Sequence, residues 1–339
     1  MKVLFIGGTG KISSACAALA VERGVELFFL NRGQTSARPA PAGVHQIHGD
    51  IRDRASAEAA LAGHTFDVVV DWIAFTADQV QLDIELFSGR TGQYIFISSA
   101  SAYQTPPVNL PATESTPLDN PHWLYSRNKI ACEERLMDEY RKAKFPMTIV
   151  RPSHTYDKTL LPFTGGWTIV DRMRKGKPVI VHGDGSSLWV MTHHRDFARG
   201  FTPLMGNSRA IGEAFHITSD EWLTWNQIYT LVANAAGVAE PKLVHVASDL
   251  INAYDEVWGA SLLGDKTNSM VFDNTKIKRI APDFACTIPF AQGAREVVEW
   301  YDADPARQVI DEKHDALQER ILAAYQRAWP ENATRWAGR

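Results

Sequence analysis

The sequence has few cysteines and no large excess of charge of either sign. Cys16, Cys132 and Cys286 stand far apart in 339 residues and form no CxxC pair. A disulfide framework or a structural zinc site is therefore excluded, and we expect three reduced cysteines and no metal. The 35 Lys and Arg residues are balanced by 39 Asp and Glu residues. This balance disfavours a protein dedicated to binding nucleic acid, which needs a basic surface.

Long hydrophobic runs are also absent. No stretch reaches the roughly 18 apolar residues that a membrane-spanning helix requires. Met1 and Lys2 lead directly into a short apolar run at 3–6, and glycines follow it, which is not the pattern of a signal peptide. We therefore expect a cytoplasmic chain that does not associate with membranes.

The first 150 residues contain short apolar runs separated by segments with helical spacing. The runs are mostly rich in β-branched or aromatic residues, as in buried parallel strands. They lie at 3–6, 25–30, 46–48, 68–72, 94–97 and 147–150. Between the first two runs, helical spacing extends from Cys16 to Arg23, and Gly24 stands where a helix would end. The alternation predicts an α/β fold with a doubly wound parallel sheet over residues 1–150.

After residue 150 the pattern changes. Turn-rich stretches appear, such as those around Gly165 and Gly183, and clean strand runs become fewer. We expect a smaller, mixed α/β C-terminal lobe over residues 151–339, with later segments returning to the first domain. No Gly/Ser-rich or Pro-rich run lies near the boundary, so we expect no flexible linker there.

A glycine-rich segment follows the first apolar run. Residues 7–13 read GGTGKIS and open the first predicted helix. A glycine at position 7 permits a tight turn, and Gly10 lets backbone amides approach a pyrophosphate at the positive end of the helix. Glycines also occur in turns for steric reasons alone, but the strand–loop–helix position favours a dinucleotide site. The expected cofactor-binding residues here are Gly7, Thr9, Gly10, Lys11 and Ile12.

The second predicted strand ends without an acidic residue. A carboxylate there would repel a 2′-phosphate, whereas Asn31 tolerates one and Arg32 can pair with it. We therefore predict NAD(P) as the cofactor with a preference for NADP, unless Arg32 is only a solvated loop residue. Asp50 and Ile51 follow the third run and are the candidates at the adenine. Asp50 either binds the adenine amino group or caps the next helix.

Three residues form a candidate catalytic set. Ser99 follows the fifth run, and Tyr125 and Lys129 are four residues apart. On a helix this spacing places both on one face, so the Lys129 ammonium can lie beneath the phenol and lower its pKa. A phenolate is a general base for a hydroxyl, and a phenol is a general acid for a carbonyl oxygen. Ser99 would hydrogen-bond the same oxygen; an isolated Tyr-x-x-x-Lys is otherwise common on helix surfaces.

With these residues in place, the chain resembles the extended short-chain dehydrogenase/reductase superfamily, and within it the NAD-dependent epimerase/dehydratase family, over nearly its full length. The matching segments are 7–10, 49–53, Ser98-Ser99 with Tyr103, Tyr125 with Lys129, Arg151-Pro152 with Tyr156, and 183–185. The resemblance implies a Rossmann domain that binds NAD(P), a C-terminal substrate lobe and a homodimer. It also implies catalysis by Ser99, Tyr125 and Lys129, with Lys129 on the nicotinamide ribose.

Several positions depart from the family pattern. Ser13 stands where a third glycine is usual, and residues 71–74 read DWIA where the family usually shows a His and a pair of small residues. Trp189 lies where many nucleotide-sugar enzymes have an arginine that clamps the diphosphate, and an indole cannot replace a guanidinium. These features resemble the atypical branch of the superfamily, which includes chloroplast stem-loop-binding proteins. Trp189 either stacks on a substrate ring or packs in the core.

The predicted function is an NAD(P)-dependent oxidoreductase or epimerase acting on a secondary alcohol or ketone of a sugar-like substrate. A sugar dehydratase is an alternative, disfavoured because Ala100 and Ser101 follow Ser99 where dehydratases often have an acidic pair. A non-catalytic Rossmann protein that binds a dinucleotide or RNA is another. His154 is either a pocket histidine without chemistry or an auxiliary acid or base. The candidates for lining the substrate site are Phe75, Tyr103, His154, Trp167 and Trp189.

Overall fold

The centre of the molecule is a parallel sheet. A computed structural model describes residues 1–33 and 38–329. The sheet has seven strands in the order β11-β6-β5-β4-β1-β2-β3. Their bounds are β1 Lys2–Ile6, β2 Glu26–Asn31, β3 His45–His48, β4 Phe66–Asp71, β5 Thr91–Ile97, β6 Met147–Pro152 and β11 Ala214–Ile217. Each predicted apolar run overlaps one of the first six strands, and the predicted doubly wound parallel sheet is confirmed.

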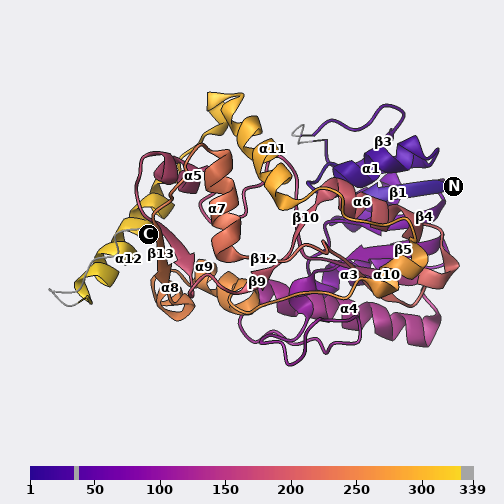
Figure 1. Cartoon of the computed structure of the whole chain (residues 1–339). Helices are drawn as coiled ribbons and strands as arrows, with labels where there is room; N and C mark the ends of the chain where they lie inside the picture. The colour runs from indigo at the N-terminus through magenta and orange to yellow at the C-terminus, as the bar shows by residue number, and fades with distance from the viewer. Residues whose placement is uncertain (34–37, 330–339) are drawn as a thin grey trace.

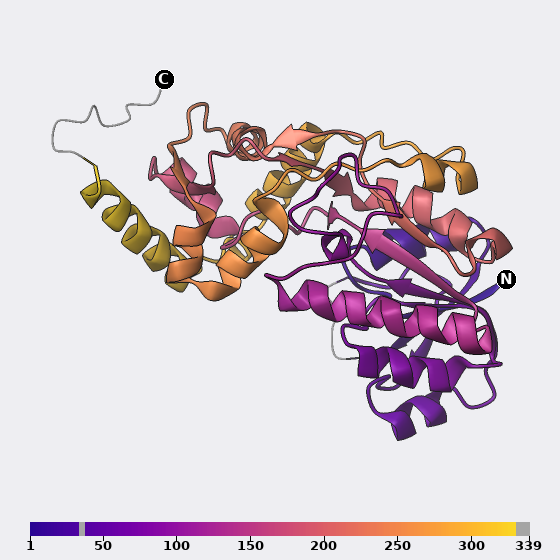
Figure 2. The ribbon, with the colours of Figure 1, turned by 90° about the horizontal axis from the view of Figure 1, so that it is seen from below.

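Helices cover both faces of this sheet, as Figures 1 and 2 show. One face carries α2 Arg54–Ala60, α3 Ala77–Phe87 and α4 Leu124–Ala143. The other carries α1 Ser13–Glu22, α6 His194–Phe201 and α10 Thr275–Ile280. Strand residues alternate between the two cores, with Phe5 facing α1 and Leu4 facing α3, so the strands are apolar on both sides. Helix α1 ends just before Gly24, which has the predicted left-handed conformation with φ of +76°.

The strand order reverses between β1 and β4. From β1 the chain builds β2 and β3 on one side, and from β4 it builds β5, β6 and β11 on the other. Ile6 at the end of β1 is paired in register with Asp71 at the end of β4. The loops that follow these two strands therefore face each other, and this is where doubly wound sheets bind their ligands.

The second lobe is built from short elements that lie beside the carboxyl edge of the sheet (Figure 1). Its strands pair in twos: β7 His154–Tyr156 with β10 Met191–His193, β8 Val179–His182 with β13 Leu243–Val246, and β9 Leu188–Trp189 with β12 Leu223–Thr224. Its α-helices are α5 Trp167–Arg174, α7 Trp225–Ala235, α8 Ser248–Tyr254, α9 Glu256–Ser261, α11 Phe290–Asp302 and α12 Glu312–Arg327. The remaining short turns are η1 Ala100–Ala102, η2 Thr202–Leu204, η3 Ser208–Ala210, the π-helical η4 Leu262–Lys266 and η5 Pro305–Arg307.

The lobe has its own aromatic core. Trp189, Trp225 and Tyr229 are buried together with Phe163 in a cluster separate from the two cores that flank the sheet. Within residues 1–33 and 38–329, no helix has the length and apolar character needed to cross a membrane. The same part of the chain contains no group of three or more side chains arranged to hold a metal ion. In doubly wound sheets the reversal of strand order leaves a crevice outside the carboxyl ends of the strands, here between the loops that follow β1 and β4.

Candidate active site

The glycine-rich loop closes the crevice on the β1 side. Gly7 has φ of +84°, a conformation strained for any other residue. A Cβ added at Gly7 would lie 2.5 Å from Cγ2 of Ile73, and one at Gly8 would lie 2.4 Å from the Phe29 ring. Both glycines are thus required by close contacts, one with the loop after β4 and one with β2. These contacts hold the glycine-rich loop against the segment that follows β4.

Ser13 closes the loop from inside. Its hydroxyl accepts a hydrogen bond from the Gly10 amide at 2.8 Å and donates one to the Gly7 carbonyl at 3.0 Å. Helix α1 begins directly after Ile12, which provides no side-chain cap for the first-turn amides. These amides and the helix dipole favour an anion, so the arrangement fits a pyrophosphate. Gly7, Thr9, Gly10, Lys11 and Ile12 all lie at this helix start.

The end of β2 is occupied by local hydrogen bonds. The Asn31 side chain accepts from the Gly33 amide at 2.9 Å and donates to Gln46 at 3.0 Å. Arg32 is exposed, and its guanidinium lies 3.9 Å from the Asp50 carboxylate. The end of β2 therefore carries no acidic side chain that would repel a phosphate. The Arg32 guanidinium can bind a phosphate, and Asp50 competes for the same guanidinium.

The loop after β3 corrects one expectation. Asp50 does not cap helix α2, because the cap is Asp53, whose carboxylate accepts from the Ser56 amide at 2.8 Å. Asp50 instead accepts from the Arg52 amide at 2.9 Å and so shapes the turn before the helix. Ile51 is buried in the core beneath α2 and α3, so its side chain is not available to an adenine.

Lys129 lies under the mouth of the crevice. Only 2% of it is exposed, and its ammonium donates to the carbonyls of Ala74 at 2.7 Å and Ile97 at 2.8 Å. The rings of Phe75 and Phe96 lie 4.7 and 4.8 Å from the ammonium. Burial lowers the pKa of Lys129 to about 8. The lysine thereby ties the loop after β4 to the end of β5.

Tyr125 is on the first turn of α4, one turn before Lys129. Its ring is 5.8 Å from the Lys129 ammonium, 4.8 Å from the Trp123 ring and 6.4 Å from the Phe75 ring. Burial raises the pKa of Tyr125 to about 12, and the polar neighbour Ser99 opposes this rise. The predicted lowering of the Tyr125 pKa by Lys129 is therefore wrong for this arrangement, because burial of the phenol dominates its pKa.

Hydroxyl groups join Ser99 to the start of α4. The Ser99 hydroxyl is 2.9 Å from that of Ser101, which accepts a hydrogen bond from Ser126 at 2.7 Å. Ser126 is the residue after Tyr125 on the helix. The structure therefore brings Ser99, Tyr125 and Lys129 to one crevice, although they come from two separate elements.

A buried ion pair behind these residues was missed by the sequence reasoning. Glu133 accepts from Nε of Arg151 at 2.9 Å and also from the hydroxyl of Ser98. The pair fixes α4 against the ends of β5 and β6 and thereby the distance between Ser99 and Tyr125. The spacing of Tyr125, Lys129 and Glu133, each four residues apart on one helical face, is the signal that points to Glu133.

The candidates for lining the substrate site separate into two groups. Phe75 is 45% exposed beside Tyr125, and His154 is partly exposed. Tyr103 and Trp167 do not line the crevice: Tyr103 is buried with its hydroxyl on His216, and Trp167 is stacked on a tyrosine in the lobe core. These two expectations are wrong because both side chains pack inward.

Trp189 and His154 form a pair. The indole of Trp189 is only 2% exposed and donates to Nδ1 of His154 at 3.2 Å. Trp189 is therefore a core residue rather than an exposed stacking platform. Burial lowers the pKa of His154 to about 3, so the imidazole is neutral and carries its proton on Nε2. A neutral donor suits a pocket histidine better than an acid–base catalyst.

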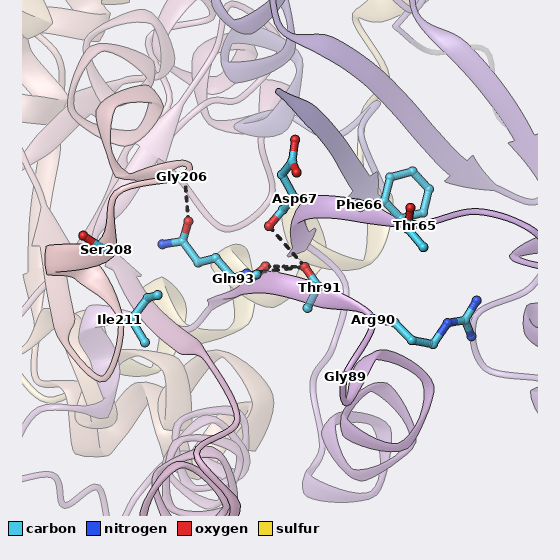
Figure 3. Close-up of a pocket in the computed structure, with 11 residues that line it drawn as sticks. Thr65, Phe66, Asp67, Gly89, Arg90, Thr91, Gln93, Gly206, Ser208 and Ile211 are labelled. Carbon is cyan, nitrogen blue, oxygen red and sulfur yellow. Dashed lines mark hydrogen bonds between the residues drawn. The ribbon is translucent and has the colours of Figure 1, made fainter.

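A second hollow, shown in Figure 3, lies at the opposite edge of the sheet, at the amino ends of β4 and β5. Gln93 accepts there from the Gly206 amide at 2.7 Å and donates to Thr148 at 2.9 Å. Arg90 donates to backbone carbonyls of Leu86 and Leu61. Arg90 and Gln93 are thus engaged in holding the surrounding chain, so we assign the candidate site to the crevice at the carboxyl edge.

Comparisons with known proteins show the family of the chain. The family model for the NAD dependent epimerase/dehydratase family matches residues 3–218. A chloroplast stem-loop binding protein of 41 kDa from Arabidopsis thaliana is 27% identical over 256 residues, which are 72% of this chain and 65% of the relative. The 2'-dehydrokanamycin reductase of Streptomyces kanamyceticus is 24% identical over 84% of this chain and 80% of the relative.

Solved structures share the fold. The dTDP-glucose 4,6-dehydratase of Bacillus anthracis, in complex with NAD, superposes with a TM-score of 0.72 at 18% identity and covers 90% of this chain and 98% of its own. The UDP-glucose 4-epimerase of Thermus thermophilus, also in complex with NAD, gives 0.70 at 20% identity over 89% of this chain and 99% of its own.

The fold and these relatives define a Rossmann-type enzyme of the extended short-chain dehydrogenase/reductase class. The match over residues 3–218 shows more: the chain belongs to the NAD-dependent epimerase/dehydratase family.

Proposed function

We propose that this protein is an NAD(P)-dependent oxidoreductase or epimerase acting on a secondary alcohol or ketone of a sugar-like substrate. The observation that carries the proposal is the convergence of Ser99, Tyr125 and Lys129 on the crevice that the glycine-rich loop closes. A protein that only binds a dinucleotide or RNA has no need of a phenol and a serine hydroxyl in this place. The slight excess of acidic residues also disfavours RNA.

In this proposal the chain's own residues handle the proton. Tyr125 gives a proton to the substrate carbonyl oxygen or takes one from the hydroxyl, and Ser99 orients that oxygen. Lys129, held by two backbone carbonyls, fixes the wall beneath Tyr125. A nicotinamide cofactor, when bound, supplies or accepts the hydride.

The residues of the loop fit such a cofactor. Gly7 to Ile12 would hold the pyrophosphate, Asp50 and Ile51 the adenine, and Asn31 and Arg32 the adenine ribose. The absence of an acid at the end of β2 supports a preference for NADP. Fluorescence titration with NADPH and NADH measures this preference. In the Arg32→Ala variant we expect NADPH to bind about tenfold more weakly while NADH is little changed.

The substrate class draws on the named relatives, which include a 2'-dehydrokanamycin reductase and a UDP-glucose 4-epimerase. Ala100 and Ser101 after Ser99 provide no acid for elimination, which disfavours a dehydratase. We also propose that the protein is cytoplasmic and that it forms a homodimer. Light scattering of the purified protein tests the homodimer.

The test of the proposal is the Tyr125→Phe variant, assayed with NADP(H) and NAD(H) against UDP-glucose, UDP-galactose and 2'-dehydrokanamycin. We expect kcat to fall about 10²- to 10⁴-fold, because the proton carrier is lost. The control is Tyr140→Phe, on the same helix four turns away, which should leave kcat unchanged. Full turnover by Tyr125→Phe would show that another group carries the proton, and no turnover by the wild type with bound dinucleotide would favour a binding protein.

A further inference from the structure

A hollow of about 350 Å³ lies in the second lobe, between helix α9 and the start of α12, and is called the lobe hollow below. This volume is in the range of sites that bind small molecules. One wall comes from the residue before α4, and the others come from α9 with its cap and from the first turns of α12. The lining residues include Trp123, Asp255, Trp258, Asp311, Lys313 and His314.

Trp123 touches both the lobe hollow and the catalytic crevice. The centre of its ring lies 4.8 Å from the centre of the Tyr125 ring. The ammonium of Lys266 lies 5.3 Å from the same ring and is paired with Asp265 at 3.2 Å. A Cβ at Gly264 would lie 2.6 Å from Cβ of Trp123, so only glycine permits this contact. The wall that Trp123 forms is therefore held in place beside the crevice.

A buried histidine brings a hydrogen-bond donor to the lobe hollow. His314 is 6% exposed, and burial lowers its pKa, so the imidazole is neutral at pH 7. The Gln318 side chain accepts from the Ile180 amide at 3.2 Å, so its NH₂ group is the one that donates to Nε2 of His314 at 3.1 Å. The imidazole proton is therefore on Nδ1.

This Nδ1 donor has no acceptor in the part of the chain that the structure describes. The hydrogen bonds of His314 there involve its backbone amide and Nε2. Gly165 packs against the other edge of the ring, nearest to Cδ2, and His314 lines the hollow. A buried donor without a partner costs free energy, and the hydroxyl of a ligand in the hollow would satisfy it.

Two of the lining residues are acids that cap helices. Oδ1 of Asp255 accepts from the Trp258 amide at 2.8 Å, and Oδ1 of Asp311 accepts from the His314 amide at 3.0 Å. Each of these bonds uses one carboxylate oxygen, so Oδ2 can accept from a ligand. Among the described residues that line the hollow, Lys313 is the one cation, and it is exposed. The net charge of the lining is thus negative, which favours a cationic ligand and disfavours a phosphate.

We propose that the lobe hollow is a binding site for a hydroxylated ring that carries an ammonium group, an amino sugar being the simplest case. The ammonium donates to Asp255 and Asp311, and a ring hydroxyl accepts from Nδ1 of His314. The C–H groups of the ring pack against the walls formed by Trp123 and Trp258. The site uses neither Tyr125 nor the dinucleotide, so the inference does not depend on the proposed function.

The test is ¹⁹F NMR of the full-length protein labelled with 5-fluorotryptophan. The two wall resonances are assigned by their loss in Trp123→Phe and Trp258→Phe. Glucosamine should shift both resonances with a Kd on the order of 1 mM. Glucose lacks the ammonium and should bind at least about fivefold more weakly. Cyclohexylamine lacks the hydroxyls and should also bind more weakly than glucosamine.

The variant that tests the charge is Asp255→Asn, because asparagine is also a good cap for α9. We expect its Kd for glucosamine to rise about fivefold and its Kd for glucose to stay within about twofold of the wild type. The matched control is Asp53→Asn, which changes the acid that caps α2 through the Ser56 amide and should leave both values unchanged.

Shifts of neither wall resonance with glucosamine would overturn the inference as a whole. Equal affinities for glucosamine and glucose, or an unchanged Kd in Asp255→Asn, would overturn the role of the ammonium. Cyclohexylamine binding as tightly as glucosamine would overturn the role of the hydroxyls. The comparison of the three probes on the wild type needs no variant and no turnover, so it remains decisive even where Tyr125→Phe is active and the proposed function fails.

Discussion

The two halves of the molecule surround their buried titratable groups differently. In the Rossmann half three buried acids lie beside arginines. Arg52 lies 3.0 Å from Asp71 and 3.4 Å from Asp83, and Glu133 is paired with Arg151. These pairs join the helices on one face of the sheet to the loops and strands that carry the site.

In the second half two buried histidines are neutral and lie among aromatic rings, and the buried Arg172 is paired with Asp315. The ring of His182 lies 4.9 Å from that of Trp225, and His154 accepts from Trp189. Burial lowers the pKa of His182 to about 4 and that of His154 to about 3. These acids of the Rossmann half therefore depend on their arginines, whereas His154 and His182 of the lobe depend on staying uncharged.

The largest expected effect comes from breaking an ion pair in the Rossmann half. Arg151→Met leaves the Glu133 carboxylate buried without its cation, so we expect a loss of about 3–5 kcal/mol in the free energy of unfolding. Urea denaturation at pH 7 measures it. The control in the lobe is Arg174→Met, which removes a half-exposed pair with Asp302 and should cost about 1 kcal/mol or less. Equal losses in the two variants would contradict the comparison.

The next effect is the response of the lobe to acid. Unfolded histidines take up a proton below about pH 6.5, whereas His182 and His154 remain neutral in the folded chain until about pH 4 and 3. Between these pH values the unfolded state thus binds more protons than the folded state. The free energy of unfolding therefore decreases as the pH is lowered, by up to about 1.4 kcal/mol per pH unit for each histidine. Urea denaturation between pH 7 and 4.5 should show a shallower slope for His182→Gln than for the wild type. An unchanged slope would assign the acid response to other groups.

The smallest effect on stability is expected at Asp83, which shares the Arg52 guanidinium with Asp71. Burial raises the pKa of Asp83 well above its usual value, so the folded chain binds a proton there more readily than the unfolded chain. As the pH rises above about 4, the Asp83 carboxyl therefore lowers the free energy of unfolding. Asp83→Asn removes this pH-dependent loss. Because Arg52 keeps Asp71, we expect a stability within about 1 kcal/mol of the wild type at pH 7. Glu133→Gln is the matched control, because Glu133 is the acid paired with Arg151. In the same assay this variant should lose clearly more free energy of unfolding than Asp83→Asn.

Features that depend on neighbours in the chain were predictable. The apolar runs gave the strands of the sheet, and the glycine at position 7 gave the turn before α1. The four-residue spacing of Tyr125 and Lys129 gave their common helical face. Period and backbone conformation are local properties, and the sequence states them directly.

Contacts between distant parts of the chain were not predictable in the same way. The aromatic residues Tyr103 and Trp167 resemble exposed lining residues in the sequence, and only the folded chain shows them packed inward. The pairing of Glu133 with Arg151 also joins segments that are separate in the sequence.

The sequence by itself thus determined the parallel sheet, the dinucleotide loop and the residues that converge at its edge. The tertiary structure decided which of them are charged, which are buried and what surrounds Tyr125. The reason is physical: a pKa and a buried contact depend on the dielectric surroundings and on groups brought together through space, and these exist only once the lobe has closed on the sheet.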